Sequence, residues 1–89
     1  MKISKEKKEK ISEQILSFLY LSSPKSLFTS HIAREVARDE EFIKTLLEGL
    51  KQNNLVVQIK INPKGVPYSQ RIRWKLSDQV YNLYKSKQP

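Results

Sequence analysis

The apolar residues of the first 54 positions recur at the three- and four-residue spacing of helices that bury one face. This spacing predicts helices over residues 4–21, 30–37 and 40–52. The residues expected to face the core are Ile11, Ile15, Phe18, Leu19, Ile32, Ala33, Val36, Ile43, Leu46, Leu47 and Leu50. The middle helix is only about two turns long.

Residues with strong end preferences flank these helices. Thr29 and Asp39 are expected to act as N-caps, because their side-chain oxygens can accept from the unpaired N–H groups of a first turn. Asn54 can adopt the left-handed conformation that ends a helix. Gly49, inside the third helix, is interpreted as a tolerated surface glycine.

After Asn54 the apolar period changes from 3.6 to 2, which predicts two strands joined by a loop rich in Pro and Gly. The first strand is expected to face the core with Leu55, Val57, Ile59 and Ile61, and the outside with Val56, Gln58 and Lys60. The second is expected to face inward with Ile72, Trp74 and Leu76, and outward with Arg71, Arg73 and Lys75. Ser77 or Asp78 then caps a last helix in which Val80, Leu83 and Tyr84 follow at helical spacing.

Three stretches resemble the buried positions of winged-helix transcriptional regulators: Ile32-Ala33-x-x-Val36, Ile43-x-x-x-Leu47-x-x-Leu50 and Asn54-Leu55-Val56. Residues 73–78, Arg-Trp-Lys-Leu-Ser-Asp, are similar to the segment that leads from their wing into the final helix. The resemblance implies an α+β winged helix-turn-helix with three helices, a two-stranded wing hairpin and a C-terminal helix. The resemblance leaves open whether a short third strand is present. One domain over 1–89 is expected, with ends that fray over 1–9 and 86–89.

The net charge of +8 is unevenly distributed along the chain. Residues 1–10 carry five Lys and two Glu, residues 11–52 five basic and six acidic residues, and residues 53–89 seven basic residues and one acidic residue. A basic excess that is concentrated in this way indicates a polyanionic partner.

The sequence offers little for catalysis or metal binding. It has no cysteine and one histidine, His31, and neither glycine lies in a phosphate-binding motif. We therefore expect a protein that has no enzymatic activity and binds no cofactor and no metal. The absence of cysteine and of a long apolar run favours a cytoplasmic protein without a membrane segment, associated with the nucleoid in a prokaryote.

The expected partner is double-stranded DNA. Lys60, Arg71, Arg73 and Lys75 are predicted on one face of the hairpin with Lys64 at its tip, and the resemblance implies that such a wing contacts the DNA backbone or minor groove. Tyr68 in the same loop can contact a sugar or phosphate. The third helix would be the recognition helix, with Lys44, Thr45 and Gln52 as contacts, although Glu40, Glu41 and Glu48 share its outer face.

Three functions are weighed: a small DNA-binding transcriptional regulator or chromatin-type protein, a protein-interaction module that docks a basic partner on the acidic third helix, and an RNA-binding protein. A homodimer is expected of many winged-helix regulators, since two copies read two half-sites. The first and last helices carry the apolar residues available for it: Tyr20, Leu21, Tyr81, Leu83 and Tyr84. For Leu83, packing in the core of its own domain is the favoured interpretation.

Overall fold

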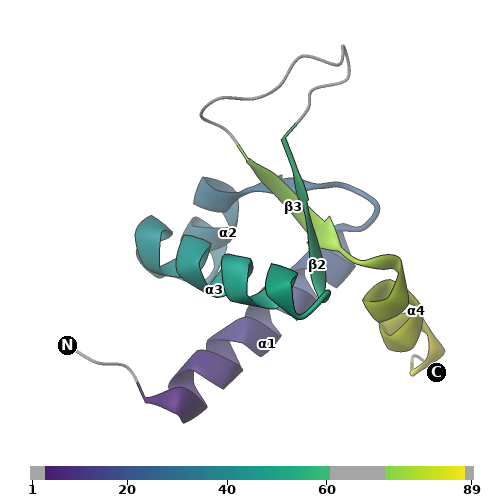
Figure 1. Cartoon of the computed structure of the whole chain (residues 1–89), viewed down its shortest axis with the longest axis horizontal. Helices are drawn as coiled ribbons and strands as arrows, with labels where there is room; N and C mark the ends of the chain where they lie inside the picture. Colours follow the sequence, from purple (N-terminus) through teal and green to yellow (C-terminus); the bar gives the residue numbers. More distant parts are fainter. Residues whose placement is uncertain (1–3, 61–71, 88–89) are drawn as a thin grey trace.

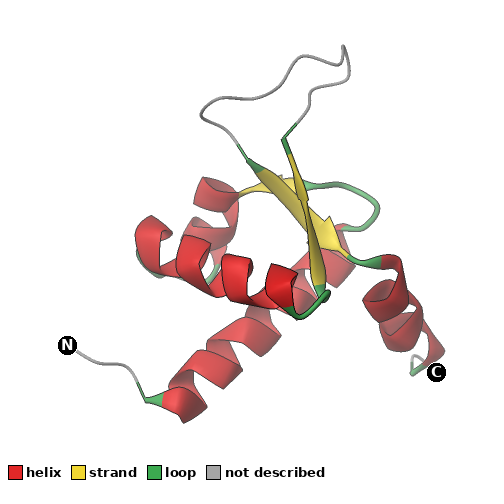
Figure 2. Cartoon of the chain, viewed as in Figure 1, coloured by secondary structure: helices red, strands yellow, loops and turns green. Residues whose placement is uncertain are grey.

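Helices and strands follow one another in the order expected for a winged helix in the computed structural model, which describes residues 4–60 and 72–87. The elements are α1 (Lys5–Ser22), β1 (Leu27–Phe28), α2 (Thr29–Glu35), α3 (Glu40–Gln52), β2 (Val56–Ile59), β3 (Arg73–Leu76) and α4 (Asp78–Ser86) (Figure 1). The short third strand, β1, is therefore present. Figure 2 shows the sheet against helices α1, α2 and α3, with α4 at one side.

Side-chain caps begin three of these helices. The backbone N–H groups of Lys7, Phe42 and Val80 donate to Ser4, Asp39 and Ser77 at 3.2, 3.2 and 3.3 Å. The predictions for Asp39 and Ser77 are confirmed. Helix α1 starts at Lys5 and α4 runs to Ser86.

Backbone turns with a positive φ end α2 and α3. Ala37 has φ 55° and Asn54 has φ 61°. The next N–H in each case reaches back five residues, from Arg38 to the Ala33 carbonyl and from Leu55 to the Leu50 carbonyl. These bonds satisfy carbonyls that a helix end leaves unpaired. The prediction for Asn54 is confirmed, whereas α2 ends before the expected limit of residue 37.

The prediction that Thr29 caps α2 is wrong. Helix α2 starts at Thr29 itself, and its N-cap residue, Phe28, makes no side-chain cap. The Thr29 hydroxyl instead accepts a hydrogen bond of 2.8 Å from the indole N–H of Trp74, which is fully buried on β3. A buried N–H without a partner is costly, so this bond allows the large ring to lie in the core.

The sheet has the strand order β1-β3-β2, and both pairs are antiparallel. In the register, Val56 lies opposite Leu76 and Gln58 opposite Trp74, so these four residues share the core face. Val56 is 3% exposed and Val57 40%. The predicted phase of β2 is therefore reversed, while the phase of β3 is confirmed by buried Trp74 and Leu76.

The core is formed by one face of each described helix and by the inner face of the sheet. Its fully buried large side chains are Ile15, Leu19, Ile32, Ile43, Leu47 and Trp74. Each such side chain contributes about 1.5–3 kcal/mol relative to an exposed one. The prediction that Leu83 packs in the core is wrong, because it is 54% exposed. A Cβ added at Gly49 would meet no atom within 4 Å, which confirms Gly49 as a surface glycine.

No helix among residues 4–60 and 72–87 is long and apolar enough to cross a membrane.

Replacing Thr29 tests the buried bond. Thr29→Val keeps the shape of the side chain but leaves the Trp74 N–H without its acceptor, so the free energy of unfolding should fall by about 1–3 kcal/mol in a urea titration. Thr29→Ser keeps the hydroxyl and should lose clearly less. Equal losses in the two variants would show that the hydroxyl is not what Trp74 requires.

Candidate nucleic-acid interface

Helix α3 is fixed at both ends and presents one face to solvent. The Asp39 cap holds its start, and the turn at Asn54 leads directly into β2. Its buried side carries Ile43, Leu47 and Leu50. The predicted outward residues are all exposed: Glu40, Glu41, Lys44, Thr45, Glu48, Lys51 and Gln52.

A polar hollow of about 260 Å³ lies where the last turns of α3 meet β2. Its lining residues are Glu48, Lys51, Gln52, Gln58 and Lys60. The Lys51 ammonium donates to the Gln58 side-chain carbonyl at 3.1 Å, which joins helix and strand across the hollow. Two of the predicted contacts, Gln52 and Lys60, thus come together here.

Lys44 and Thr45 lie nearer the start of α3 on the same exposed face. The Thr45 hydroxyl donates to the Glu41 backbone carbonyl at 3.1 Å. Since that bond uses the only hydroxyl proton, Thr45 can accept from a partner but can donate to a phosphate only if the bond breaks. The exposed ammonium group of Lys44 carries three hydrogen-bond donors.

The expectation that Lys60, Arg73 and Lys75 share one face of the hairpin is wrong. Arg73 and Lys75 lie opposite Ile59 and Val57, on the face of the sheet turned away from Trp74. Lys60 falls on the same alternate positions of the chain as Val56 and Gln58, and it lines the hollow beside α3. The reason is the reversed phase of β2, which moves every outward residue of that strand to the other side.

Lys75 also lies apart from α3. It borders a second hollow, of about 240 Å³, together with Ser23, Pro24 and Tyr81. The remaining predicted contacts, Lys64, Tyr68 and Arg71, fall outside the described residues.

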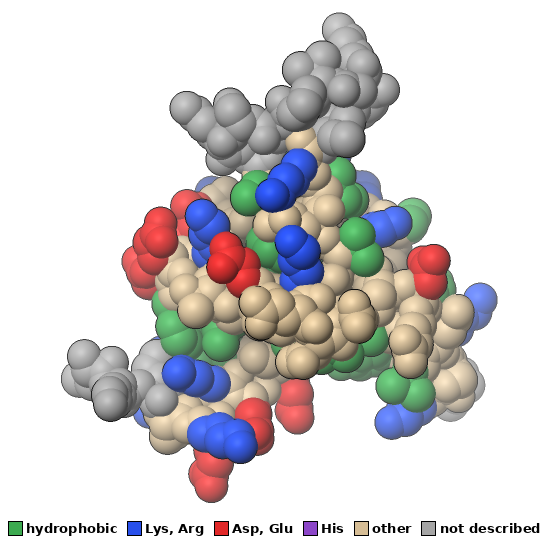
Figure 3. All heavy atoms as spheres, in the orientation of Figure 1, with side chains coloured by type: hydrophobic (Ala, Val, Ile, Leu, Met, Phe, Trp, Pro, Cys, Tyr) green, Lys and Arg blue, Asp and Glu red, His purple; other side chains and the backbone are tan. Residues whose placement is uncertain are grey.

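Acidic and basic side chains are mixed on the exposed face of α3. Figure 3 shows acidic side chains toward the start of the helix and basic ones toward the sheet. Glu40 and Glu41 occupy the first turn, and Glu48 lines the hollow together with two lysines. Among the described residues, no group of three or more His, Cys, Asp or Glu is placed to hold a metal ion.

Three residues that line the hollow, Glu48, Lys51 and Gln58, were not predicted as nucleic-acid contacts. Lys51 was one of the outward positions of the third helix, and its C-terminal location next to a strand was the available signal. Gln58 carried a misleading signal, because a glutamine in a strand is ordinarily assigned to the solvent face.

Solved structures share this fold. The chain is similar to Staphylococcus aureus MepR in a complex with DNA, with a TM-score of 0.71 and 18% identity over 85% of this chain and 58% of that chain. A second structure of MepR, described as a transcription regulator of the S. aureus multidrug efflux pump MepA, gives a TM-score of 0.69 at 18% identity, over 85% of this chain and 52% of that one. A mutant of Lactococcus lactis ZitR gives 0.67 at 14% identity, over 85% and 47%.

The chain thus spans about half the length of the structures it matches. At these identities the likeness shows the winged-helix fold. No family model matches the sequence, and no curated protein matches it.

The cap that starts α3 can be tested apart from any ligand. Asp39→Ala removes the acceptor of the Phe42 N–H, so the free energy of unfolding should fall by about 0.5–2 kcal/mol in a denaturant titration. Asp39→Asn keeps an acceptor oxygen and should retain most of the stability. An alanine variant as stable as the wild type would contradict the role of Asp39 as the cap.

Proposed function

We propose that the protein binds double-stranded DNA as a small transcriptional regulator or chromatin-type protein, without enzymatic activity. The observation that carries this proposal is the hollow between α3 and β2, where Lys51, Gln52 and Lys60 meet at the exposed edge of a winged-helix fold. The solved complex of MepR with DNA supports it, because the two folds are alike over most of this chain.

The exposed face of α3 suits a duplex groove. The major groove of B-DNA is about 12 Å wide and admits one α-helix. With α3 in that groove, Lys44 and Lys51 are available to the phosphates at its edges, and Lys60 extends the contact from the strand side. Lys64 and Arg71 are proposed as phosphate or minor-groove contacts, and Tyr68 as a sugar or phosphate contact.

The acidic residues of α3 limit what the helix can read. Carboxylates near phosphates are repelled, and a glutamate contacts a base only by accepting from a cytosine amino group. Glu40, Glu41 and Glu48 therefore favour binding that is dominated by phosphate contacts and tolerant of sequence. Arg73 and Lys75, on the other face of the sheet, add long-range attraction more than direct contact.

The same acidic residues favour a second candidate function, the docking of a basic protein partner on α3. In a transcription or replication assembly, Glu41 and Glu48 would face that partner, and their reversal to Lys would abolish its binding. RNA binding uses the same cations, so competition between duplex DNA and single-stranded RNA in one titration separates the two nucleic acids. We also propose that the protein forms a homodimer and acts in the cytoplasm.

Removing the lysines of the hollow tests DNA binding. Lys51→Ala and Lys60→Ala should each weaken binding to unrelated duplexes and lower the slope of log affinity against log salt by about 0.9. Fluorescence anisotropy at several salt concentrations measures both quantities. The same reduction is expected of Lys64→Ala and Arg71→Ala.

Lys25→Ala is the matched control, since Lys25 lies in the link before β1, the strand at the opposite edge of the sheet from β2. It removes the same charge and should leave the slope nearly unchanged. Slopes that fall equally in all variants would indicate a general charge effect and contradict the assigned interface.

Glu48 provides a test with the opposite sign. Glu48→Gln removes the carboxylate beside Lys51 and Lys60 and keeps the size of the side chain, so affinity for duplex DNA should rise several-fold at low salt. Glu13→Gln on α1 makes the same change away from the hollow and should have a smaller effect. Weaker binding by the Glu48 variant would show that its carboxylate takes part in recognition.

A further inference from the structure

The outer face of the sheet, turned away from the core, carries two cations that lie outside the candidate DNA interface. Arg73 lies opposite both Phe28 of β1 and Ile59 of β2. Lys75 lies opposite Val57, which is 40% exposed. The other four side chains are half-buried. Among the described strand residues, this face therefore has three apolar side chains, two cations and no acid.

A hollow of about 240 Å³, the α4 hollow, continues this face toward the start of α4. Its lining residues are Ser23, Pro24, Lys75, Leu76, Asp78 and Tyr81. Pro24, Leu76 and the ring of Tyr81 supply apolar contact surface, while the Ser23 hydroxyl already donates to the Leu19 carbonyl at 3.0 Å. A space of this size holds one large apolar side chain of a partner, the kind of anchor on which interfaces depend.

The mixture of side chains on the outer face fits a protein partner better than a nucleic acid. The phosphates of a duplex offer no apolar surface, and the bases of a single strand stack on aromatic rings. Phe28 is the one aromatic residue of this face among the described strand residues, and it is half-buried. An acidic partner with apolar side chains matches both the cations and the apolar residues.

A helix has the dimensions to cover this face. Adjacent strands lie about 4.8 Å apart, so three strands span about 10 Å, close to the diameter of a helix with its side chains. Arg73 and Lys75 are two positions apart on β3, which corresponds to about 7 Å along the strand. Carboxylates four positions apart on a helix are separated by about 6 Å along its axis, so one helix can pair with both cations.

We propose that the outer face of the sheet and the α4 hollow bind an acidic amphipathic helix of a partner protein. Carboxylates of that helix pair with Arg73 and Lys75, its apolar side chains contact Val57 and Ile59, and one of them enters the α4 hollow. Gln58, which lines the hollow beside α3, belongs to the opposite face of the sheet. The contact therefore goes beyond DNA binding, does not require it, and is compatible with a duplex on α3.

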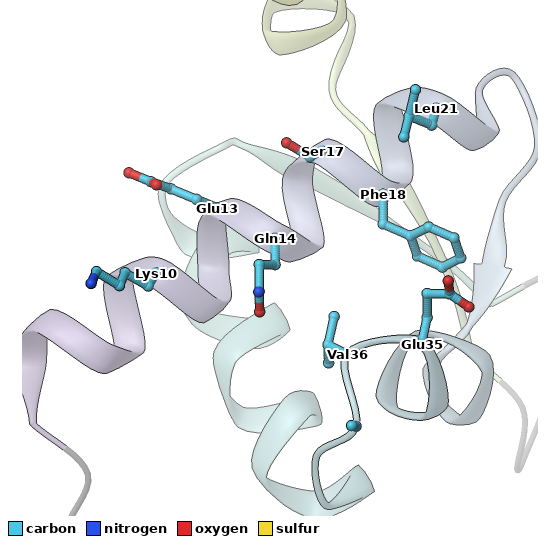
Figure 4. A pocket seen from close by; sticks show the side chains of 9 residues that line it. Lys10, Glu13, Gln14, Ser17, Phe18, Leu21, Glu35 and Val36 are labelled. Atoms are coloured by element: carbon cyan, nitrogen blue, oxygen red, sulfur yellow. The ribbon is translucent and has the colours of Figure 1, made fainter.

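The exposed residue Leu21 does not offer an equivalent site. It lines a hollow of about 710 Å³ between α1 and the end of α2 (Figure 4), together with Glu13 and Glu35. Lys10 is the one cation among the described residues that line this hollow. Because its carboxylates repel an acidic helix, Leu21 is a matched control for Val57. Both are exposed apolar side chains, at 80% and 40%.

Fluorescence anisotropy of a labelled peptide and the full chain tests the contact. The peptide consists of Leu, Ala and Glu, with Leu on one face of a helix and Glu residues four positions apart beside it. A scrambled peptide of the same composition measures charge attraction alone, and the wild type should bind it at least about tenfold more weakly.

Substitutions locate the contact. Lys75→Gln and Val57→Gln should each weaken binding of the peptide about three- to tenfold, since the first removes a cation and the second an apolar contact. Lys44→Gln and Leu21→Gln make the same changes elsewhere and should leave the affinity nearly unchanged. Asp78→Asn removes the one acid among the described residues of the α4 hollow and should tighten binding at low salt. Circular dichroism and thermal unfolding confirm that each variant is folded.

The titration contains no DNA, so its failure is distinguishable from a failure of DNA binding. Duplex DNA added afterwards should leave the peptide bound. Equal affinity for the two peptides, equal losses in Lys44→Gln and Lys75→Gln, or displacement of the peptide by the duplex would each overturn the proposal. Binding of single-stranded DNA that depends on Lys75, in place of peptide binding, would assign the face to a nucleic acid and overturn it as well.

Discussion

The hydrogen bond between Trp74 and Thr29 joins the wing to the helix-turn-helix. Trp74 lies on β3, the central strand, and its fully buried ring completes the core formed by α1, α2 and α3. Its N–H reaches the first residue of α2, 45 positions earlier in the chain. Since a buried donor needs an acceptor and a buried ring needs close packing, strand and helix are held in one relative position. Helix α3 packs on α2, and strand β2 pairs with β3, so the positions of both depend on that pair.

The arrangement of charge follows from this placement. The sheet register turns Arg73 and Lys75 away from α3 but brings Lys60 toward it. Gln58 accepts from Lys51 on the inner side of the strand, so a polar residue is satisfied next to the core and a cation is held at the edge of the helix. Glu48 lies among these groups. A surface of this kind attracts a polyanion by its cations and discourages close approach by its acids, which suits phosphate contact better than base reading.

Helix α4 shows how a short element can be both anchored and exposed. The stacked rings of Tyr20 and Tyr84, with Tyr81 beside them, fix one side of α4 against the end of α1. Leu83, three positions after buried Val80, is 54% exposed. The hollow between α1 and the end of α2 is lined by both apolar and charged side chains, among them Phe18, Val36 and Glu35.

By itself, the sequence determined the helices, most of their caps, the strand that carries Trp74 and Leu76, and the order of elements that resembles a winged helix. These features depend on local spacing and on residues with strong local preferences, such as Asp39, Asn54 and Ser77. Only the tertiary structure decided the phase of β2, the partner of Thr29 and the exposure of Leu83. Three consecutive apolar residues, Leu55, Val56 and Val57, fit either face of a strand, and pairing with β3 selects one of them. A hydroxyl next to a helix start serves a cap or a distant donor equally well until the indole is in place, and the last turns of α4 extend beyond the core that would bury Leu83.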